Sequence, residues 1–101
     1  MPEICSKHLT IMGFFADWCP HCVKFHPEFK KAMSEQPKDV HWHIFKDNTR
    51  EGKLAMKKYN ITGFPTVLIY LPHQDRLVKY TGPRTSAGLT TFITDYNRTN
   101  V

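Results

Sequence analysis

The stretch Ala16-Asp17-Trp18-Cys19-Pro20-His21-Cys22 decides how the rest of the chain is interpreted. The run that leads into it, residues 9–16, is mostly apolar, lacks a helical period and predicts a buried strand. The pattern that leads out of it is amphipathic, and Pro20 suits the first turn of a helix, where its missing N–H costs nothing. The two cysteines are therefore expected at a strand–helix junction.

The rest of the chain predicts further strands and helices in alternation. The expected strands are residues 9–16, 40–46, 66–71 and 76–81, and the expected helices begin at Pro20, at Asn48 and at Thr85 or Ser86. Asn48 is expected to cap the second helix, with Glu51 in the capping-box position. Pro27 is expected to kink the first helix.

This order, β-α-β-α-β-β-α, predicts an α/β fold. Helical crossovers imply that the first two strands are parallel, and a short turn at 72–75 implies that the last two are antiparallel. The predicted structure is a mixed four-stranded sheet with helices on both faces. A length of 101 residues is typical of one domain, so we assign residues 1–101 to a single domain.

The charge of the chain is positive but dispersed. The formal net charge is +5 and the pI is about 9.2, yet lysine and arginine form no block longer than two residues. This distribution favours a solvated basic surface over a nucleic-acid interface. No run is long enough to span a membrane, and residues 1–8 lack the apolar core of a signal peptide. We therefore expect a cytoplasmic monomer that binds neither nucleic acid nor membrane.

The spacing of Cys19 and Cys22 suits thiol–disulfide exchange. Residues three apart at the start of a helix face each other over one turn. The unpaired N–H groups and the dipole of the helix stabilise a thiolate on Cys19, whereas Cys22 is expected to be more buried. Cys19 should therefore attack a disulfide, and Cys22 should resolve the mixed disulfide.

The two residues between the cysteines are expected to tune this pair. An imidazole at His21 would stabilise the Cys19 thiolate and lower its pKa below the free value of about 8.5. Pro20 stiffens the turn and removes one N–H donor. Because a stabilised thiolate makes the disulfide a stronger oxidant, the sequence favours an oxidising couple.

The alternative use of two such cysteines is metal binding. Further ligands for zinc would be Cys5, His26, His41 or His43, but none has the spacing of a zinc finger or ribbon. Haem attachment requires histidine where Val23 stands. We expect no metal and no cofactor beyond the dithiol itself. His26 is then predicted to be a core histidine, His41 and His43 to lie on a strand surface, and Cys5 to be an incidental thiol.

Four segments together resemble the thioredoxin superfamily. Residues 14–22 resemble the active-site segment, and residues 61–66 resemble the loop that carries the family's cis-proline. Pro27 matches the proline inside the active-site helix, and Gly82 matches the glycine before the last helix. The resemblance covers residues 10–96, which is most of the chain.

The resemblance implies a thioredoxin-like fold and a protein dithiol–disulfide oxidoreductase. It implies Cys19 as nucleophile, Cys22 as resolving thiol, and a cis Pro65 beside them where the Phe64–Pro65 backbone binds substrate. The residues expected to modulate the site are Trp18, Pro20 and His21. The implied partners are protein thiols and disulfides, together with a reductase or oxidase that recycles the dithiol.

The sequence departs from the family pattern at three places. Only 18 residues precede Cys19, so the first strand and helix of a full thioredoxin are expected to be reduced or absent, as in members of glutaredoxin size. The dipeptide Pro20-His21 resembles that of DsbA-type oxidases. Gly13 stands where many members carry a buried carboxylate, so the proton of Cys22 is expected to pass to water or to His43.

Two other functions compete with this interpretation. One is a glutathione-dependent reductase like glutaredoxin, which the short N-terminal part favours and the missing glutathione-binding motif opposes. The other is a binding module of the same fold with weak redox activity. Acceleration of insulin reduction by dithiothreitol separates an active dithiol from a vestigial one.

Overall fold

The computed structural model describes residues 8–36 and 39–99. Their elements have the predicted β-α-β-α-β-β-α order. In chain order they are β1 (Thr10–Phe15), α1 (Pro20–Glu35), β2 (His41–Lys46), α2 (Arg50–Lys58), β3 (Thr66–Leu71), β4 (Arg76–Lys79) and α3 (Ser86–Thr99). Cys5 lies outside the described residues.

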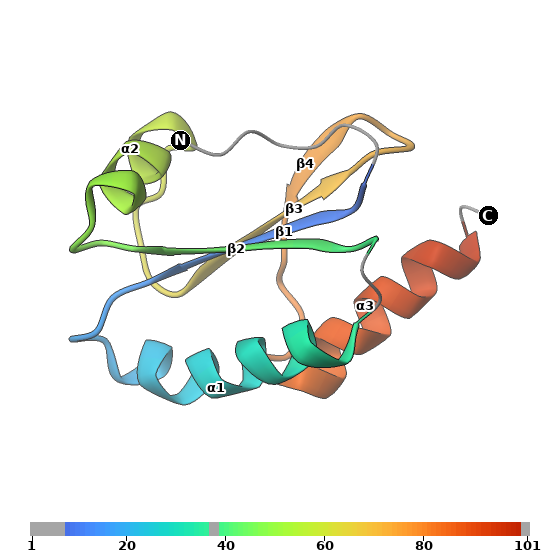
Figure 1. Cartoon of the computed structure of the whole chain (residues 1–101), viewed down its shortest axis with the longest axis horizontal. Helices are drawn as coiled ribbons and strands as arrows, with labels where there is room; N and C mark the ends of the chain where they lie inside the picture. The colour runs from blue at the N-terminus through green and yellow to red at the C-terminus, as the bar shows by residue number, and fades with distance from the viewer. Residues whose placement is uncertain (1–7, 37–38, 100–101) are drawn as a thin grey trace.

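The four strands form one mixed sheet in the order β2-β1-β3-β4. β1 pairs with β2 in parallel, and β3 pairs with β1 and β4 in the antiparallel sense, as predicted. Helices α1 and α3 lie together on one face of the sheet and α2 lies on the other (Figure 1). This is the thioredoxin-like arrangement, in which β1 is one of the two central strands and α1 begins beyond the end of β1, at one end of the molecule (Figure 1).

The two faces of the sheet carry cores of unequal size. The larger core lies under α1 and α3, and its fully buried side chains include Ile11, Phe15, Phe29, Ile69, Leu89 and Ile93. The smaller core lies under α2 and contains Met12, Phe14, Phe45 and Ala55. Full burial of a large apolar side chain stabilises the fold by roughly 1.5–3 kcal/mol. The larger core is therefore the main support of the helix that follows the cysteines.

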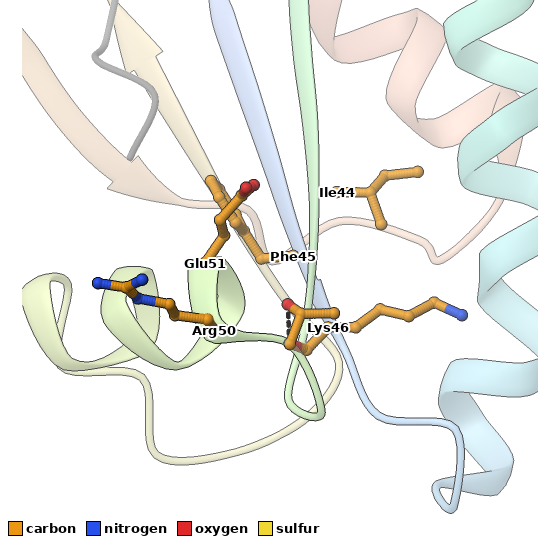
Figure 2. A pocket seen from close by; sticks show the side chains of 6 residues that line it. Ile44, Phe45, Lys46, Arg50 and Glu51 are labelled. Carbon is orange, nitrogen blue, oxygen red and sulfur yellow. Dashed lines mark hydrogen bonds between the residues drawn. The ribbon is translucent and has the colours of Figure 1, made fainter.

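Strand β2 contributes alternate side chains to the two faces. Ile44 and Lys46 point towards the α1 side of the sheet, whereas Phe45 points towards α2 (Figure 2). The ring of His43 stacks on the ring of Phe45, with 6.1 Å between their centroids. His43 therefore shares the α2 face of the sheet with Phe45.

The N-cap of α2 is Thr49, so the prediction of Asn48 was wrong by one residue. The Thr49 Oγ1 accepts a hydrogen bond from the Gly52 backbone N–H at 3.0 Å. The Asn48 side-chain amide instead donates to Asp17 Oδ2 at 3.4 Å, from a turn distant in sequence. The Asn48 side chain, which local pattern predicted to cap the helix, is therefore engaged in a tertiary hydrogen bond instead.

The other element boundaries agree closely with prediction. The Thr85 Oγ1 accepts a hydrogen bond from the Gly88 N–H at 3.0 Å, so Thr85 is the one of the two predicted residues that caps α3. Pro27 lies inside α1. Strand β4 ends at Lys79, two residues before the predicted end at Thr81. The hydroxyl of Tyr80 donates to the Pro83 carbonyl, which shows that the chain already turns there.

Candidate active site: the Cys19–Cys22 dithiol

Cys19 is the N-cap residue of α1, and Pro20 occupies the first helical position. Its backbone is extended, with φ −95° and ψ 117°, and its carbonyl accepts the first bond of the helix from the Val23 N–H at 3.0 Å. The Cys19 N–H donates to the Ala16 carbonyl at 3.2 Å, which closes the turn after β1. The Cys19 sulfur therefore lies at the positive end of the helix dipole.

The two sulfurs have different neighbours although they are one turn apart. The Cys19 thiol lies 3.7 Å from the Phe64 carbonyl oxygen, to which it donates. The Cys22 sulfur accepts a bond from the Ala16 backbone N–H at 3.5 Å. Cys19 is 6% exposed and Cys22 is 2% exposed, as the sequence predicted. Cys19 thus lies towards the surface and Cys22 lies towards the core.

These surroundings shift the two thiol pKa values in opposite directions. Hydrogen bonding from the Cys22 thiol lowers the pKa of Cys19, with smaller help from the backbones of Cys22 and His21 and from the charge of Arg84; partial burial opposes them. Burial raises the pKa of Cys22 to about 11. When the reduced site loses one proton, the negative charge is therefore favoured on Cys19 and the remaining proton on Cys22.

His21 and Pro20 lie on the exposed side of this turn. His21 contributes its backbone hydrogen bond to the lowered pKa of Cys19. Participation of its imidazole stays a prediction.

Trp18 lies beside the dithiol on the surface, with 71% of its area exposed. Its indole Nε1–H donates to Asp47 Oδ2 at 2.7 Å, and the edge of its ring meets Phe64 with 5.8 Å between centroids. The neighbouring Asp17 carboxylate accepts from Lys46 Nζ at 3.0 Å. The turn before the cysteines is therefore tied to the turn between β2 and α2.

The segment before β3 completes the site. The Phe64–Pro65 peptide bond is cis, as the resemblance implied, and Pro65 is buried. The Thr66 hydroxyl donates to the Gly63 carbonyl at 2.7 Å and holds this turn. Because the Phe64 carbonyl faces the Cys19 sulfur, the structure brings together both cysteines, Trp18 and the Phe64–Pro65 segment.

Arg84 belongs to the site and was missed in the sequence. It lies between β4 and α3, and its positive charge lowers the pKa of both cysteines. It also lines a cavity of about 240 Å³ together with Pro65 and Phe25. The one local sign of a role for Arg84 was its place as a basic residue directly after the Gly82-Pro83 turn. The order of the strands in the sheet is what brings that turn to the dithiol.

The place of the family's buried carboxylate is closed. A Cβ at Gly13 would lie 2.6 Å from the Phe15 ring and 2.8 Å from the Phe29 ring, so aromatic side chains fill the space. His43 lies on the α2 face of the sheet, whereas Cys22 packs into the core under α1. Of the two acceptors predicted for the proton of Cys22, water and His43, the prediction of His43 is therefore wrong.

Several cavities lie around the sheet. One of about 410 Å³ lies between β2 and α2, where Phe45, Arg50 and Glu51 are among the residues that line it (Figure 2). The dithiol borders a different cavity, of about 200 Å³, whose lining includes Cys22. Among the residues that the structure describes, three or more His, Cys, Asp or Glu side chains nowhere gather in a way that would hold a metal ion. Within the same residues, every helix is too short or too polar to cross a membrane.

Comparison with known proteins assigns the family. Residues 2–95 match the family model for thioredoxin. The chain belongs to the thioredoxin family. It is 38% identical over 88 residues to protein disulfide isomerase-like 2-3 of Oryza sativa subsp. japonica, covering 86% of this chain and 19% of that protein. It is 33% identical over 91 residues to protein disulfide-isomerase 2-3 of Arabidopsis thaliana, covering 89% and 20%.

Solved structures agree on the fold of this thioredoxin-family chain. The J-Trx1 fragment of ERdj5 superposes with a TM-score of 0.76 at 19% identity, over 90% of this chain and 42% of that one. The chain spans about a fifth of the length of the curated relatives it matches, 19% and 20% for the two named above. The comparisons therefore establish a thioredoxin-family domain.

Proposed function

We propose that this domain is a thiol–disulfide oxidoreductase that acts on protein thiols and disulfides. The observation that carries the proposal is the division of charge in the dithiol. Cys19, at the helix N-terminus, has a lowered pKa, and the buried Cys22 has a pKa of about 11. A site in which one thiol ionises more readily than the protonated thiol next to it is suited to successive attack and resolution.

In the reducing direction, the Cys19 thiolate attacks one sulfur of a substrate disulfide. The substrate S–S bond breaks, and a mixed disulfide forms between Cys19 and the substrate while the other substrate sulfur leaves as a thiolate. Cys22 then loses its proton and attacks the Cys19 sulfur. This forms the Cys19–Cys22 disulfide and releases the second substrate thiolate, so that the domain is oxidised by two electrons and the substrate is reduced. The oxidising direction is the reverse.

The surroundings of Cys19 favour an extended protein substrate. The exposed Trp18 ring and the half-buried Phe64 flank the sulfur, and the backbone before Pro65 lies beside it. A substrate backbone paired there would place its own sulfur within reach of Cys19. The names of the relatives, protein disulfide isomerases, support the same substrate class.

The test is reduction of insulin by dithiothreitol in the Cys5→Ser background. The domain should accelerate the reaction, and Cys19→Ser should abolish the acceleration. Cys22→Ser should instead accumulate a mixed disulfide through Cys19, visible as a mass increase that a reductant removes. A domain that gives neither acceleration nor such an adduct overturns the proposed function.

We further propose that the Cys19–Cys22 couple is more oxidising than that of an ordinary thioredoxin. The lowered pKa of Cys19 supports this, because it stabilises the reduced form. Equilibration with glutathione redox buffers measures the potential. A value of roughly −120 to −180 mV is expected for an oxidase or isomerase, and a value near about −270 mV would assign a reductase instead.

A further inference from the structure

The cavity beside Cys22 lies between the end of β1, the first turns of α1 and the end of β2. It has a volume of about 200 Å³ and is lined by Phe15, Ala16, Asp17, Cys22, Val23, His26 and Lys46. A water molecule takes about 30 Å³ in the liquid, so the cavity has room for more than one. Water in this cavity can therefore connect the Cys22 thiol to Asp17, His26 and Lys46, although the thiol itself is buried.

His26 is the histidine of this cavity and follows Cys22 by one helical turn in α1. Residues four apart on a helix share a face, so the imidazole and the thiol both face the cavity. The His26 ring packs edge-on against Phe15, with 5.3 Å between centroids and 84° between planes. This contact holds the half-buried imidazole in place.

Burial and the neighbouring charges together lower the pKa of His26, which favours its neutral imidazole. Burial is the main cause that lowers its pKa below 6.5, and Lys46 of β2 and Lys30 of α1 lower it further. Asp17, in the turn before α1, acts in the opposite direction and is outweighed. A neutral imidazole carries one nitrogen that can accept a proton.

The other charged groups that line the cavity are already engaged. Asp17 accepts hydrogen bonds from Lys46 at 3.0 Å and from Asn48 at 3.4 Å. The ammonium of Lys46 donates and cannot accept. The position of Gly13 is closed by aromatic rings, so a carboxylate has no place there. Of the polar side chains on this cavity wall, His26 is thus the one with a free basic site.

We propose that His26 accepts the proton of Cys22, through water in this cavity, when Cys22 resolves the mixed disulfide. The inference rests on the proposed function and names the base that this function needs. As the Cys22–H bond breaks, the proton passes through water to the imidazole. The Cys22 sulfur bonds to the Cys19 sulfur, and the Cys19–substrate bond breaks with its electron pair on the departing sulfur. The imidazolium then returns its proton to solvent.

The resolution step can be measured without a protein substrate. Reduced protein in the Cys5→Ser background is mixed in a stopped-flow instrument with excess dithiobis(nitrobenzoate), and the release of coloured thionitrobenzoate is followed. The first phase depends on reagent concentration and reports attack by Cys19. The second phase is independent of that concentration and reports attack by Cys22 on the Cys19 adduct. Because any reactive dithiol gives these phases, the result does not depend on insulin reduction or on the physiological substrate.

The expected signature is the pH dependence of the second phase. With His26 as acceptor, its rate rises as the imidazole loses its proton and is then flat from about pH 7 to about pH 8.5. His26→Gln should slow this phase by about 10²-fold at pH 7, the lower end of the usual range for proton-transfer catalysis. The residual rate should then rise about tenfold per pH unit, because it depends on direct ionisation of Cys22.

Two further measurements separate proton transfer from a packing role. Imidazole in the buffer should restore the slow phase of His26→Ala, since the truncation opens space in the cavity. His43→Gln, a histidine of the other sheet face, is the matched control and should behave as the parent. The proposal is overturned if the parent rate climbs about tenfold per unit across the whole range. It is equally overturned if the His26 variants slow the phase by one constant factor that imidazole does not change.

Discussion

The two sulfurs of this domain lie one helical turn apart but in two different regions. Cys19 lies in a surface region with Trp18, Phe64 and Arg84. Hydrogen bonding from Cys22, helped by the backbones of Cys22 and His21 and by the charge of Arg84, lowers its pKa. Cys22 lies in an interior region of aromatic side chains beside a cavity, where burial raises its pKa to about 11.

The difference shows that position, more than residue type, assigns the two chemical roles. Both residues are cysteines in one helical turn, and the helix start stabilises charge on the first while the core disfavours charge on the second. The same division makes resolution depend on removing a proton from a buried thiol. Four experiments test how sharply the two regions are separated.

Placing a carboxylate in the interior region should cause the largest loss of stability. Gly13→Asp brings a Cβ within 2.6 Å of Phe15 and 2.8 Å of Phe29 and buries an unpaired charge. Overpacking and charge burial together should lower the free energy of unfolding by about 3–5 kcal/mol. Urea denaturation followed by circular dichroism measures this loss.

Gly63→Ala is the matched control for that change. A Cβ at Gly63 meets no described atom within 4 Å, and its backbone is in the ordinary region, so its stability should stay within about 0.5 kcal/mol. If Gly13→Asp is as stable as the control, the interior is not packed as described.

At pH 7, iodoacetamide should alkylate Cys19 more than about 100 times faster than it alkylates Cys22. A pKa of about 11 leaves roughly one part in 10⁴ of Cys22 as thiolate. A thiol with the ordinary pKa of about 8.5 already leaves more than about one part in 10², and the pKa of Cys19 is lowered. Peptide mapping after brief iodoacetamide treatment of reduced protein gives both rates. The Cys22 rate should rise about tenfold per pH unit up to about pH 11, whereas that of Cys19 should level off at lower pH. Equal rates at the two positions would remove the basis of the comparison.

Removing the thiol of Cys22 should raise the pKa of Cys19. The Cys22 hydrogen bond is the first cause of the lowered Cys19 pKa, so Cys22→Ala should shift thiolate formation to higher pH. Cys22→Ser keeps a hydroxyl donor and should shift it less. Thiolate absorbance during a pH titration, in the Cys5→Ser background, measures both variants. An unchanged titration in Cys22→Ala would mean that the two regions are not coupled through this bond.

The smallest loss of stability is expected from removing the contact between Trp18, in the turn before Cys19, and Asp47, which follows β2. Asp47→Ala removes the acceptor of the Trp18 indole, 2.7 Å away, and should cost about 0.5–1 kcal/mol because the pair is exposed. Asp95→Ala, which removes an exposed ion pair with Arg98 on α3, should cost less than about 0.5 kcal/mol. A loss from Asp47→Ala no greater than from Asp95→Ala would show that the indole bond does not support the turn.

The sequence alone predicted the elements that depend on local pattern. The apolar run before the cysteines and the proline after Cys19 were enough to place the strand–helix junction and the order of thiol burial. The period-2 alternation of residues 40–46 already separated His43 from Trp42 and Ile44. Which of these faces lies under α1 is decided by the tertiary structure, and the assignment of a role to His43 failed for that reason.

The features that prediction missed depend on segments far apart in the chain. Asn48 and Thr49 are both good caps, and the bond from Asn48 to Asp17, 31 residues away, decides between them. Arg84 reaches the dithiol because the turn after β4 lies beside the Pro65 segment. Lys46 of β2 lines the cavity of Cys22 and His26, a long-range proximity that no local pattern records.

The tie between the turns after β1 and β2 has a consequence for how the domain folds. Asp17 bonds to Lys46 and Trp18 bonds to Asp47, each across 29 residues of chain. The closure of that loop costs entropy, which contacts elsewhere must offset before the turn is fixed. A peptide of residues 10–35 would carry both cysteines without these partners. The turn before the dithiol therefore gains these two bonds only when β2 lies beside β1, so a nascent chain gains them only after Asp47 has been made.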